Sequence, residues 1–249
     1  MRYVLKIAYD GTAYAGWQRQ KNALTVQEVL EEALFKALKI SVSITASGRT
    51  DAGVHAVGQV CHFDSEKITV PFHKLPDCLN VYLPADIRVL EGWEGKDGFD
   101  SNRSAKRKTY AYSLYLSKRD MPLKDRYSVR IEDRLDVALL NEYAKCMEGT
   151  HDFKAFCASG SSVKTTVRTI YQIQIEESES FGSKDIKIFV TGNGFLYNMV
   201  RTMVGEMIAL ATGKKTQESL LQAFETGDRS LLGKTMPAKG LTLMEVLYV

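Results

Sequence analysis

The chain has 249 residues, of which 45% are hydrophobic and 25% are charged, and this balance excludes disordered and fibrous proteins. Its formal net charge of +3 is too small to identify a nucleic-acid-binding protein, so the distribution of charge matters more than the total. The four cysteines form no Cys-x-x-Cys pair and no histidine stands at a zinc-ligand spacing beside them, which argues against disulfides and a structural metal.

The first residues, MRYVLKIAYD, place Lys6 and Asp10 where a signal peptide needs its apolar segment. No apolar run approaches the ~20 residues that a membrane-spanning helix requires. We therefore expect a cytoplasmic protein that does not enter a membrane.

The N-terminal region predicts a strand followed by a helix. Residues 2–9 have the composition of a strand and end at an Asp-Gly turn pair. Thr25 and Glu28 form the pattern of a capping box, and apolar residues then recur at the helical period. We predict a helix over residues 25–39.

The stretch SVSITASGR (41–49) is rich in β-branched residues and alternates, so it predicts a strand that delivers Arg49 and Asp51 at its end. VGQVCHFD (57–64) predicts a second strand leaving the turn, and a short helix is expected over 71–79. Two more strands are predicted before the middle of the chain: 85–93 and 106–117.

The second half of the chain repeats this mixture of elements. Helices are predicted at three places: 136–147, 195–212, and after residue 216. Strands are predicted at three others: 168–177, 185–192 and 241–249. Because the connections are short and hairpin-like, the pattern favours an α+β fold with two similar α/β halves, 1–104 and 105–249, around a mainly antiparallel sheet.

The segment SGRTDAGVHA (47–56) concentrates polar residues where a chain usually just turns. If the strand continues to the turn, Arg49 and Asp51 share one face, and the guanidinium lowers the pKa of the carboxyl by roughly 1 to 3 units. Considered alone, a turn-forming aspartate is the favoured interpretation. An aspartic protease is excluded because its chemistry needs a second such carboxylate, and the sequence has no second copy.

Basic and aromatic residues adjoin in RSAKRK (103–108) and the following TYAYSLYL. A solvated strand end and a phosphate-binding patch beside stacking tyrosines both fit this pattern. On the predicted helix 195–212, Arg201 stands one position outside the apolar stripe with Tyr197 one turn earlier, and a solvated face is about as good an interpretation as a ligand contact.

Other enzyme classes lose support. GNGFLYNMVRTMVG (192–205) begins like a dinucleotide-binding fingerprint, but Tyr197 occupies the position of its third glycine. The sequence also has no Walker A loop and no G-x-S-x-G elbow. These patterns argue against a nicotinamide enzyme, an NTPase and a serine hydrolase.

Six segments stand in order across essentially the whole chain: YDGTAYAGWQRQ (9–20), SGRTDAGVHAVGQV (47–60), RSAKRKTYAYSLY (103–115), HDFKAFCASG (151–160), GNGFLYNMVRTMVG (192–205) and PAKGLTLMEVLYV (237–249). Together they closely resemble the motifs of the tRNA pseudouridine synthase A family.

The resemblance implies a pseudouridine synthase fold with a central cleft, in which the first half carries the catalytic aspartate and the second completes the cleft and the dimer interface. It implies isomerisation of uridine to pseudouridine at positions 38, 39 and 40 of the tRNA anticodon stem-loop by a homodimer. Asp51 would be the nucleophile and Arg49 its charge partner. Tyr110 would stack on the target base, Leu241 would form a cleft wall, and Arg201 would close on the side of Asp51.

The implied reaction moves no electrons to a cofactor and consumes no water, so we expect no cofactor and no metal. The carboxylate can attack the sugar or the ring, or remove a sugar proton to give a glycal, and both routes stay open. A catalytically inactive RNA-binding protein with the same basic cleft is the alternative. We predict that four basic side chains contact RNA: Arg19, Lys21, Arg103 and Lys106.

Overall fold

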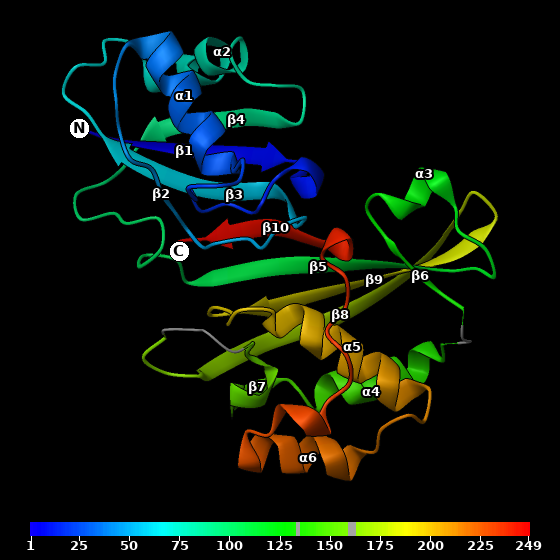
Figure 1. Ribbon diagram of the computed structural model, residues 1–249. Coiled ribbons are helices and arrows are strands. Elements are labelled where there is room, and N and C mark those ends of the chain that lie inside the picture. The colour runs from blue at the N-terminus through cyan, green and yellow to red at the C-terminus, as the bar shows by residue number, and fades with distance from the viewer. Residues whose placement is uncertain (133–134, 159–162) are drawn as a thin grey trace. The chain divides into compact units, whose positions relative to one another are not determined.

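A computed structural model gives the architecture and describes residues 1–132, 135–158 and 163–249 (Figure 1). By its contacts the chain divides into two compact units. Unit 1 comprises Met1–Lys106 and Thr242–Val249, and unit 2 comprises Arg107–Leu241. The last strand of the chain thus belongs to unit 1, whereas the predicted halves, 1–104 and 105–249, place it in the second.

Unit 1 contains strands in the order β4-β1-β3-β10. Their bounds are Arg2–Tyr9 for β1, His55–Asp64 for β3, Ile87–Glu94 for β4 and Leu241–Leu247 for β10. β1 pairs antiparallel with β3 and β4, whereas β10 pairs parallel with β3. A two-residue strand, β2 (Thr45–Ala46), joins the same edge of β3 as β10 does.

Two helices, α1 (Val26–Leu38) and α2 (Leu75–Asn80), lie on one side of the unit 1 strands (Figure 1). Thr25 caps α1, because its hydroxyl oxygen accepts a hydrogen bond from the backbone N–H of Glu28. The apolar repeat of α1 is buried, with Leu30 and Leu34 fully excluded from solvent. The predicted helix over 25–39 and the predicted helix over 71–79 are confirmed.

Unit 2 contains the strand order β5-β9-β8-β7, in which all neighbours are antiparallel. The bounds are Arg107–Leu116 for β5, Gly149–Asp152 for β7, Val167–Ser180 for β8 and Ser183–Gly192 for β9. A short strand, β6 (Val129–Ile131), pairs parallel with β5. The predicted strands over 106–117, 168–177 and 185–192 are confirmed, whereas β6 and β7 carry no pattern that predicted them.

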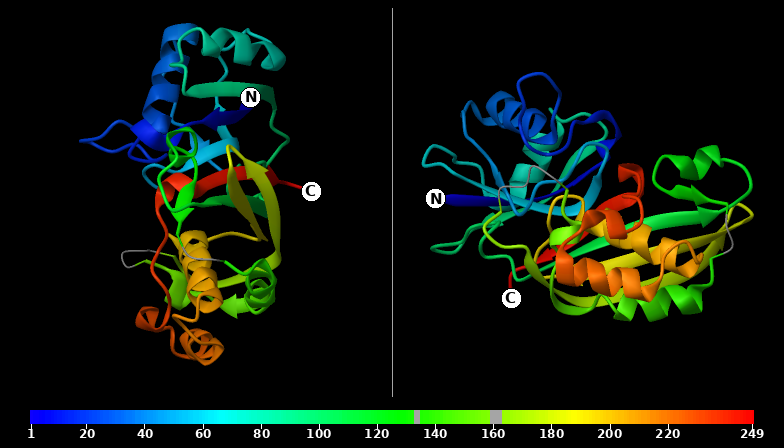
Figure 2. Two further views of the ribbon diagram at one scale, coloured as in Figure 1. Left: turned by 90° about the vertical axis from the view of Figure 1, so that its right-hand side faces the viewer. Right: turned by 60° about the horizontal axis from the view of Figure 1, so that its bottom comes forward.

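The helices of unit 2 are α3 (Pro122–Asp125), α4 (Val137–Lys145), α5 (Met199–Ala211) and α6 (Gln217–Thr226). α4 contacts both α5 and β8, and α5 contacts β5, so this pair of helices covers one face of the strands (Figure 2). α+β architecture with mainly antiparallel strands is therefore confirmed in both units.

Within the described residues, every helix is too short or too polar to cross a membrane. The same part of the chain brings no three histidine, cysteine, aspartate or glutamate side chains together in a group that could hold a metal ion.

Candidate functional site

The loop between β2 and β3 carries Asp51. The predicted strand over 41–49 is wrong in extent, because regular pairing ends at Ala46. Beyond it, one backbone bond remains, from the N–H of Ser47 to the carbonyl oxygen of Val60 (2.7 Å). Side-chain bonds follow: the Ser47 hydroxyl donates to the amide oxygen of Gln59 (2.6 Å), and the Gln59 amide nitrogen donates to the carbonyl oxygen of Gly48 (2.9 Å). The argument that Arg49 and Asp51 share a strand face therefore fails, and both residues lie in an irregular loop.

This loop, residues 47–54, leaves Asp51 partly buried and Arg49 exposed. The chain reverses at Gly53, whose φ of 78° lies in the left-handed region that glycine adopts without strain. The backbone N–H of Val54 closes the turn on the carbonyl oxygen of Asp51 at 3.1 Å. Asp51 is thus held on a defined turn and is partly exposed.

The segment after β1 braces the loop through backbone bonds. The N–H of Trp17 donates to the carbonyl oxygen of Thr50 (3.0 Å), and the N–H of Gly53 donates to that of Tyr14 (3.3 Å). These bonds enclose Asp51 on both sides along the chain. Trp17 itself is buried at 2% exposure and packs in the core.

Two further features stabilise the contact between the loop 47–54 and the segment after β1. The hydroxyl groups of Tyr9 and Thr50 share a buried hydrogen bond of 2.8 Å. At Gly16, an added Cβ would lie only 2.5 Å from the carbonyl oxygen of Thr50, so the two segments pack backbone against backbone. Sequence reasoning missed these positioning residues, although the two glycines of YDGTAYAG were a visible signal of close approach.

Tyr110 lies on β5 in unit 2 and is 7% exposed. Its ring meets the ring of Phe195 edge to face, with centroids 5.2 Å apart. Two residues earlier on the same strand face, burial and the neighbouring Arg168 charge lower the pKa of Lys108 to about 8. This strand face thus carries an aromatic ring beside a mostly buried amine.

Arg201 lies on α5, but the predicted start of this helix at residue 195 is wrong. The helix begins at Met199, because Asn198 has a left-handed backbone (φ 63°) that an α-helix cannot contain. Tyr197 precedes the helix and is 49% exposed, so Tyr197 and Arg201 do not share a helix face one turn apart as predicted.

The guanidinium of Arg201 is held from two sides. Its Nε donates to the carbonyl oxygen of Met236 (2.6 Å), and its Nη1 donates to the side-chain oxygen of Asn198 (2.6 Å). Leu241 is the last residue of unit 2 and is 6% exposed. It follows Gly240, where an added Cβ would lie 2.7 Å from the ring of Tyr112, so the chain before Leu241 packs tightly on β5.

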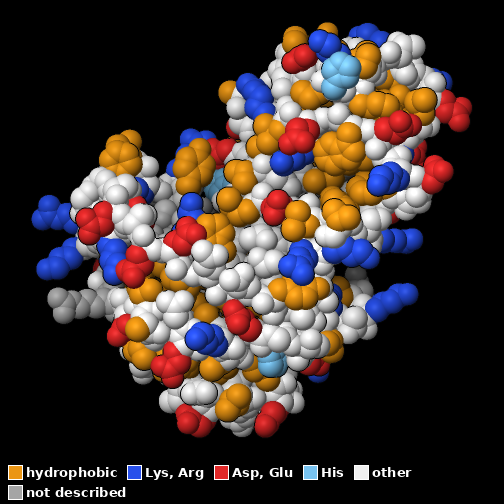
Figure 3. All heavy atoms as spheres, turned by 180° about the vertical axis from the view of Figure 1, so that it is seen from behind, with side chains coloured by type: hydrophobic (Ala, Val, Ile, Leu, Met, Phe, Trp, Pro, Cys, Tyr) orange, Lys and Arg blue, Asp and Glu red, His pale blue; other side chains and the backbone are white. Residues whose placement is uncertain are grey.

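The four predicted RNA-contacting residues all belong to unit 1, and their side chains are exposed. Arg19 forms ion pairs with Glu28 and Glu31 on α1, at 3.2 and 2.8 Å. Figure 3 shows one face of the surface, where basic and acidic side chains are interspersed and no single-sign patch covers the face. The contribution of Arg19, Lys21, Arg103 and Lys106 to binding stays a prediction.

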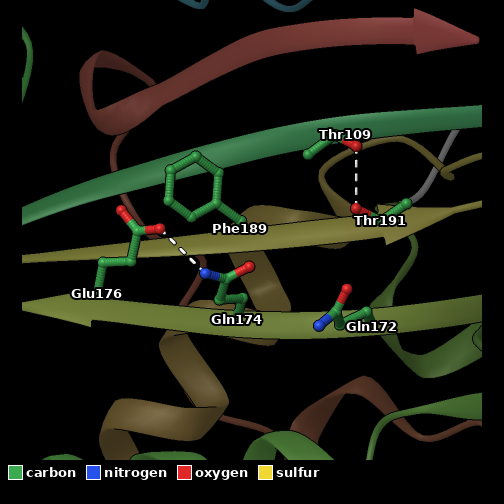
Figure 4. Close-up of a pocket in the computed structure, with 6 residues that line it drawn as sticks. All are labelled: Thr109, Gln172, Gln174, Glu176, Phe189 and Thr191. Atoms are coloured by element: carbon green, nitrogen blue, oxygen red, sulfur yellow. Dashed lines mark hydrogen bonds between the residues drawn. The ribbon is translucent and has the colours of Figure 1, made fainter.

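A hollow of about 150 Å³ lies on β5, β8 and β9 (Figure 4). It is lined by Thr109, Gln172, Gln174, Glu176, Phe189 and Thr191. Because neighbouring side chains of a strand point to opposite faces, this hollow lies on the face opposite to Tyr110. Its lining includes neither Tyr110 nor Arg201.

The predicted site residues fall into two groups. Arg49 and Asp51 share one loop of unit 1, whereas Tyr110, Arg201 and Leu241 belong to unit 2. The motif HDFKAFCASG ends at residues 159 and 160, which lie outside the described residues.

Comparisons with known proteins agree with these motifs. The family model described as tRNA pseudouridine synthase matches residues 6–92 and 143–249. The protein named tRNA pseudouridine synthase A from Thermoanaerobacter sp. (strain X514) is 42% identical over 245 residues, which are 98% of each chain. The protein of the same name from Bacillus subtilis (strain 168) is 39% identical and is matched over 100% of this chain and 99% of its own.

A chain of a solved Cbf5-Nop10-Gar1 complex matches 97% of this chain and 48% of its own at 12% identity. Its TM-score of 0.40 is too low to support an argument. The sequence matches are sufficient by themselves, because they extend over both units and over nearly the full length of the relatives. The chain belongs to the tRNA pseudouridine synthase family.

Proposed function

We propose that this protein isomerises uridine to pseudouridine at positions 38, 39 and 40 in the anticodon stem-loop of tRNA, without a cofactor. Membership of the family supports the reaction type. The observation that supports the assignment to a residue is the loop 47–54, which backbone bonds brace around the partly exposed Asp51. A catalytic group must be held firmly in the position in which it reacts. An aspartate that only forms a turn has no such requirement.

The reaction exchanges one bond to the sugar for another. The bond from sugar C1′ to N1 of uracil breaks, the ring turns, and C1′ bonds to C5, while C5 loses its proton and N1 gains one. Asp51 either forms a transient covalent bond or removes a sugar proton to give a glycal, and its carboxylate serves both routes.

The remaining residues have roles in exposing and holding the base. A base within a stack must leave it first, at a cost of a few kcal/mol, and Arg49 is the side chain that fills the gap. Tyr110 recovers part of this cost by stacking on the extruded uracil, at ~1 to 3 kcal/mol per base. Leu241 forms an apolar wall, and Arg201 pairs with the negative charge of the site.

Exposed basic residues of unit 1 supply the electrostatic part of tRNA binding. Arg19, Lys21, Arg103 and Lys106 contact phosphates, so affinity falls as salt rises. We further propose that the protein acts in the cytoplasm and as a homodimer, in which both subunits contact one tRNA.

Replacement of Asp51 tests the catalytic assignment. D51N keeps the size of the side chain and removes its charge, so we expect loss of pseudouridine formation with unchanged tRNA affinity. The measurement is release of tritium from [5-³H]uridine in unmodified tRNA, together with a filter-binding titration. Substantial turnover by folded D51N would refute the role of Asp51.

The same assay decides between the enzyme and the alternative of an inactive RNA-binding protein. The alternative predicts salt-sensitive tRNA binding by the wild-type protein with no tritium release at any enzyme concentration. Release that stops at the number of target uridines per tRNA supports the isomerase.

A further inference from the structure

Asn198 has an unusual backbone for its place in the fold. It directly precedes α5 and has φ 63° and ψ 1°, whereas a residue in this position is normally extended and caps the helix with its side chain. The Asn198 side chain makes no such capping bond. Residues other than glycine enter the left-handed region at a cost and do so often at functional sites, with asparagine among the best tolerated.

The side chain of Asn198 is directed to Arg201 instead. Its oxygen accepts a hydrogen bond of 2.6 Å from Nη1 of Arg201, which lies three residues further along the chain. The left-handed backbone and this bond therefore occur in one residue. The backbone conformation starts the helix, and the side chain fixes the orientation of the first charged group on it.

A second contact fixes the other edge of the guanidinium. Nε of Arg201 donates to the carbonyl oxygen of Met236, and the N–H of Met236 donates back to the carbonyl oxygen of Arg201 (3.2 Å). The segment with Met236 is itself anchored to α5, because an added Cβ at Gly205 would lie 1.8 Å from the carbonyl oxygen of Lys234. The Met236 carbonyl is thus a rigid acceptor for Nε of Arg201, and the Asn198 side chain is the acceptor for Nη1.

We propose that Asn198 is a positioning residue that holds Arg201 in its working orientation before tRNA binds. The inference rests on the proposed function and on the role of Arg201 in it. An arginine side chain loses rotamer entropy when it is fixed, and a side chain fixed before the substrate binds does not incur that loss during the reaction. Asn198 therefore affects turnover through Arg201 rather than through its own contact with substrate.

Two substitutions separate the backbone of Asn198 from its side chain, and a third is a control. N198G keeps the left-handed conformation without strain and removes only the acceptor. N198D keeps the acceptor and a tolerated backbone. K39G is the matched control, because Lys39 is also left-handed (φ 56°) but ends α1 in unit 1, whereas Asn198 and Arg201 belong to unit 2.

The first measurement is single-turnover tritium release on unmodified tRNA, with the tRNA dissociation constant and the melting temperature of each variant. We expect N198G to lose about tenfold in rate with tRNA affinity within twofold of wild type. N198D should recover most of this loss, and K39G should react like wild type. An N198G rate within twofold of wild type overturns the proposal.

A double-mutant cycle with R201A tests whether the effect passes through Arg201. We expect N198G/R201A to be as slow as R201A alone, because the acceptor has no function without the guanidinium. If the two losses multiply instead, Asn198 acts independently of Arg201 and the proposal is refuted.

A readout that does not depend on activity keeps the proposal separate from the proposed function. The Nε–H signal of Arg201 in ¹H–¹⁵N NMR spectra, assigned by its absence in R201K, should be protected from solvent exchange in the wild type and exchange at least tenfold faster in N198G. Wild-type protein without tritium release would refute the proposed function, and unchanged exchange in N198G would refute the positioning role.

Discussion

The hydroxyl pair of Tyr9 and Thr50 links β1 to the loop that carries Asp51. Both side chains are buried, and burial raises the pKa of Tyr9 above its usual value, so the phenol is neutral and the pair is an ordinary hydrogen bond. Loss of one partner leaves the other buried and unsatisfied, which costs about 1 to 3 kcal/mol.

Y9F is therefore expected to lower the free energy of unfolding by about 1 to 3 kcal/mol and to slow tritium release several-fold, with unchanged tRNA affinity. Denaturant titration and single-turnover kinetics give the two values. Y3F is the matched control on the same strand, because the Tyr3 hydroxyl bonds to the carbonyl oxygen of Ile68 and not to the loop. Equal rates for Y9F and Y3F would contradict the bracing role.

Lys108 gives a pH dependence whose sign follows from its surroundings. Burial first, and the Arg168 charge second, disfavour the protonated amine and lower its pKa from 10.5 to about 8. Between these two values the unfolded chain binds more protons than the folded one, so the contribution of Lys108 to stability rises with pH across that window.

K108M removes this titration. We expect the variant to be more stable than wild type at pH 7, where the wild type buries a charge, and the difference to shrink by pH 9.5. Urea unfolding at both pH values measures it. A difference that is the same at both pH values would show that the amine is not forced toward its neutral form.

At the scale of elements, the contact between the segment after β1 and the loop 47–54 depends on Gly16. Its φ of 89° and the 2.5 Å that would separate an added Cβ from the Thr50 carbonyl oxygen both forbid a side chain. G16A should therefore shift the Asp51 loop, lower the melting temperature by several degrees and reduce turnover at least tenfold.

Gly98 provides the control for G16A. It has a comparable φ of 74°, but an added Cβ there meets nothing within 4 Å. G98A carries the backbone strain without the collision, so it should lose some stability and keep full turnover. The comparison of calorimetric melting and tritium release in both variants isolates the contact, and similar turnover in G16A and G98A would refute it.

Elements defined by local signals were predictable from the sequence, and those defined by distant partners were not. The helix α1 carries its own cap at Thr25 and an apolar repeat, so its bounds followed from the pattern. The strand predicted over 41–49 has the right composition, but regular pairing covers only Thr45 and Ala46, and the Gln59 side chain binds the Ser47 hydroxyl and the Gly48 carbonyl oxygen beyond them. The start of α5 was misplaced because nothing local shows that Asn198 is left-handed.

The candidate site followed the same division. Asp51 and Arg49 were found by their motif, whereas the bracing by Tyr9 and Gly16 depends on contacts over more than thirty positions of the chain. Such contacts leave only a glycine or a buried polar residue as a trace in one sequence.

At the scale of the whole molecule, unit 2 is an insertion in the sequence of unit 1. Its residues follow Lys106 and precede Thr242, where the chain returns to unit 1. The pairing of Thr242 with His55 and of Leu243 with Ala56 places the last strand on β3, and Leu243 is fully buried. A fragment of residues 1–106 lacks this strand and exposes an edge of β3. We expect that fragment to show no cooperative thermal unfolding.

Attachment of residues 242–249 to the fragment through a Gly/Ser linker should restore cooperative unfolding. Circular dichroism melting of both forms makes the comparison, and a variant of the linked form with L243D is the control for specific pairing. A cooperative transition of equal midpoint in the fragment alone would show that β10 contributes nothing to unit 1.

The inserted arrangement also sets the order of events during protein synthesis. Residues 107–241 emerge before the eight residues that complete unit 1, and at about 5 to 20 residues per second their translation takes roughly 7 to 27 s. Unit 2 therefore has all of its chain while β3 still lacks its last neighbour. The loop that carries Asp51 adjoins β3, so the ribosome finishes the chain before the strand beside this loop is fully paired.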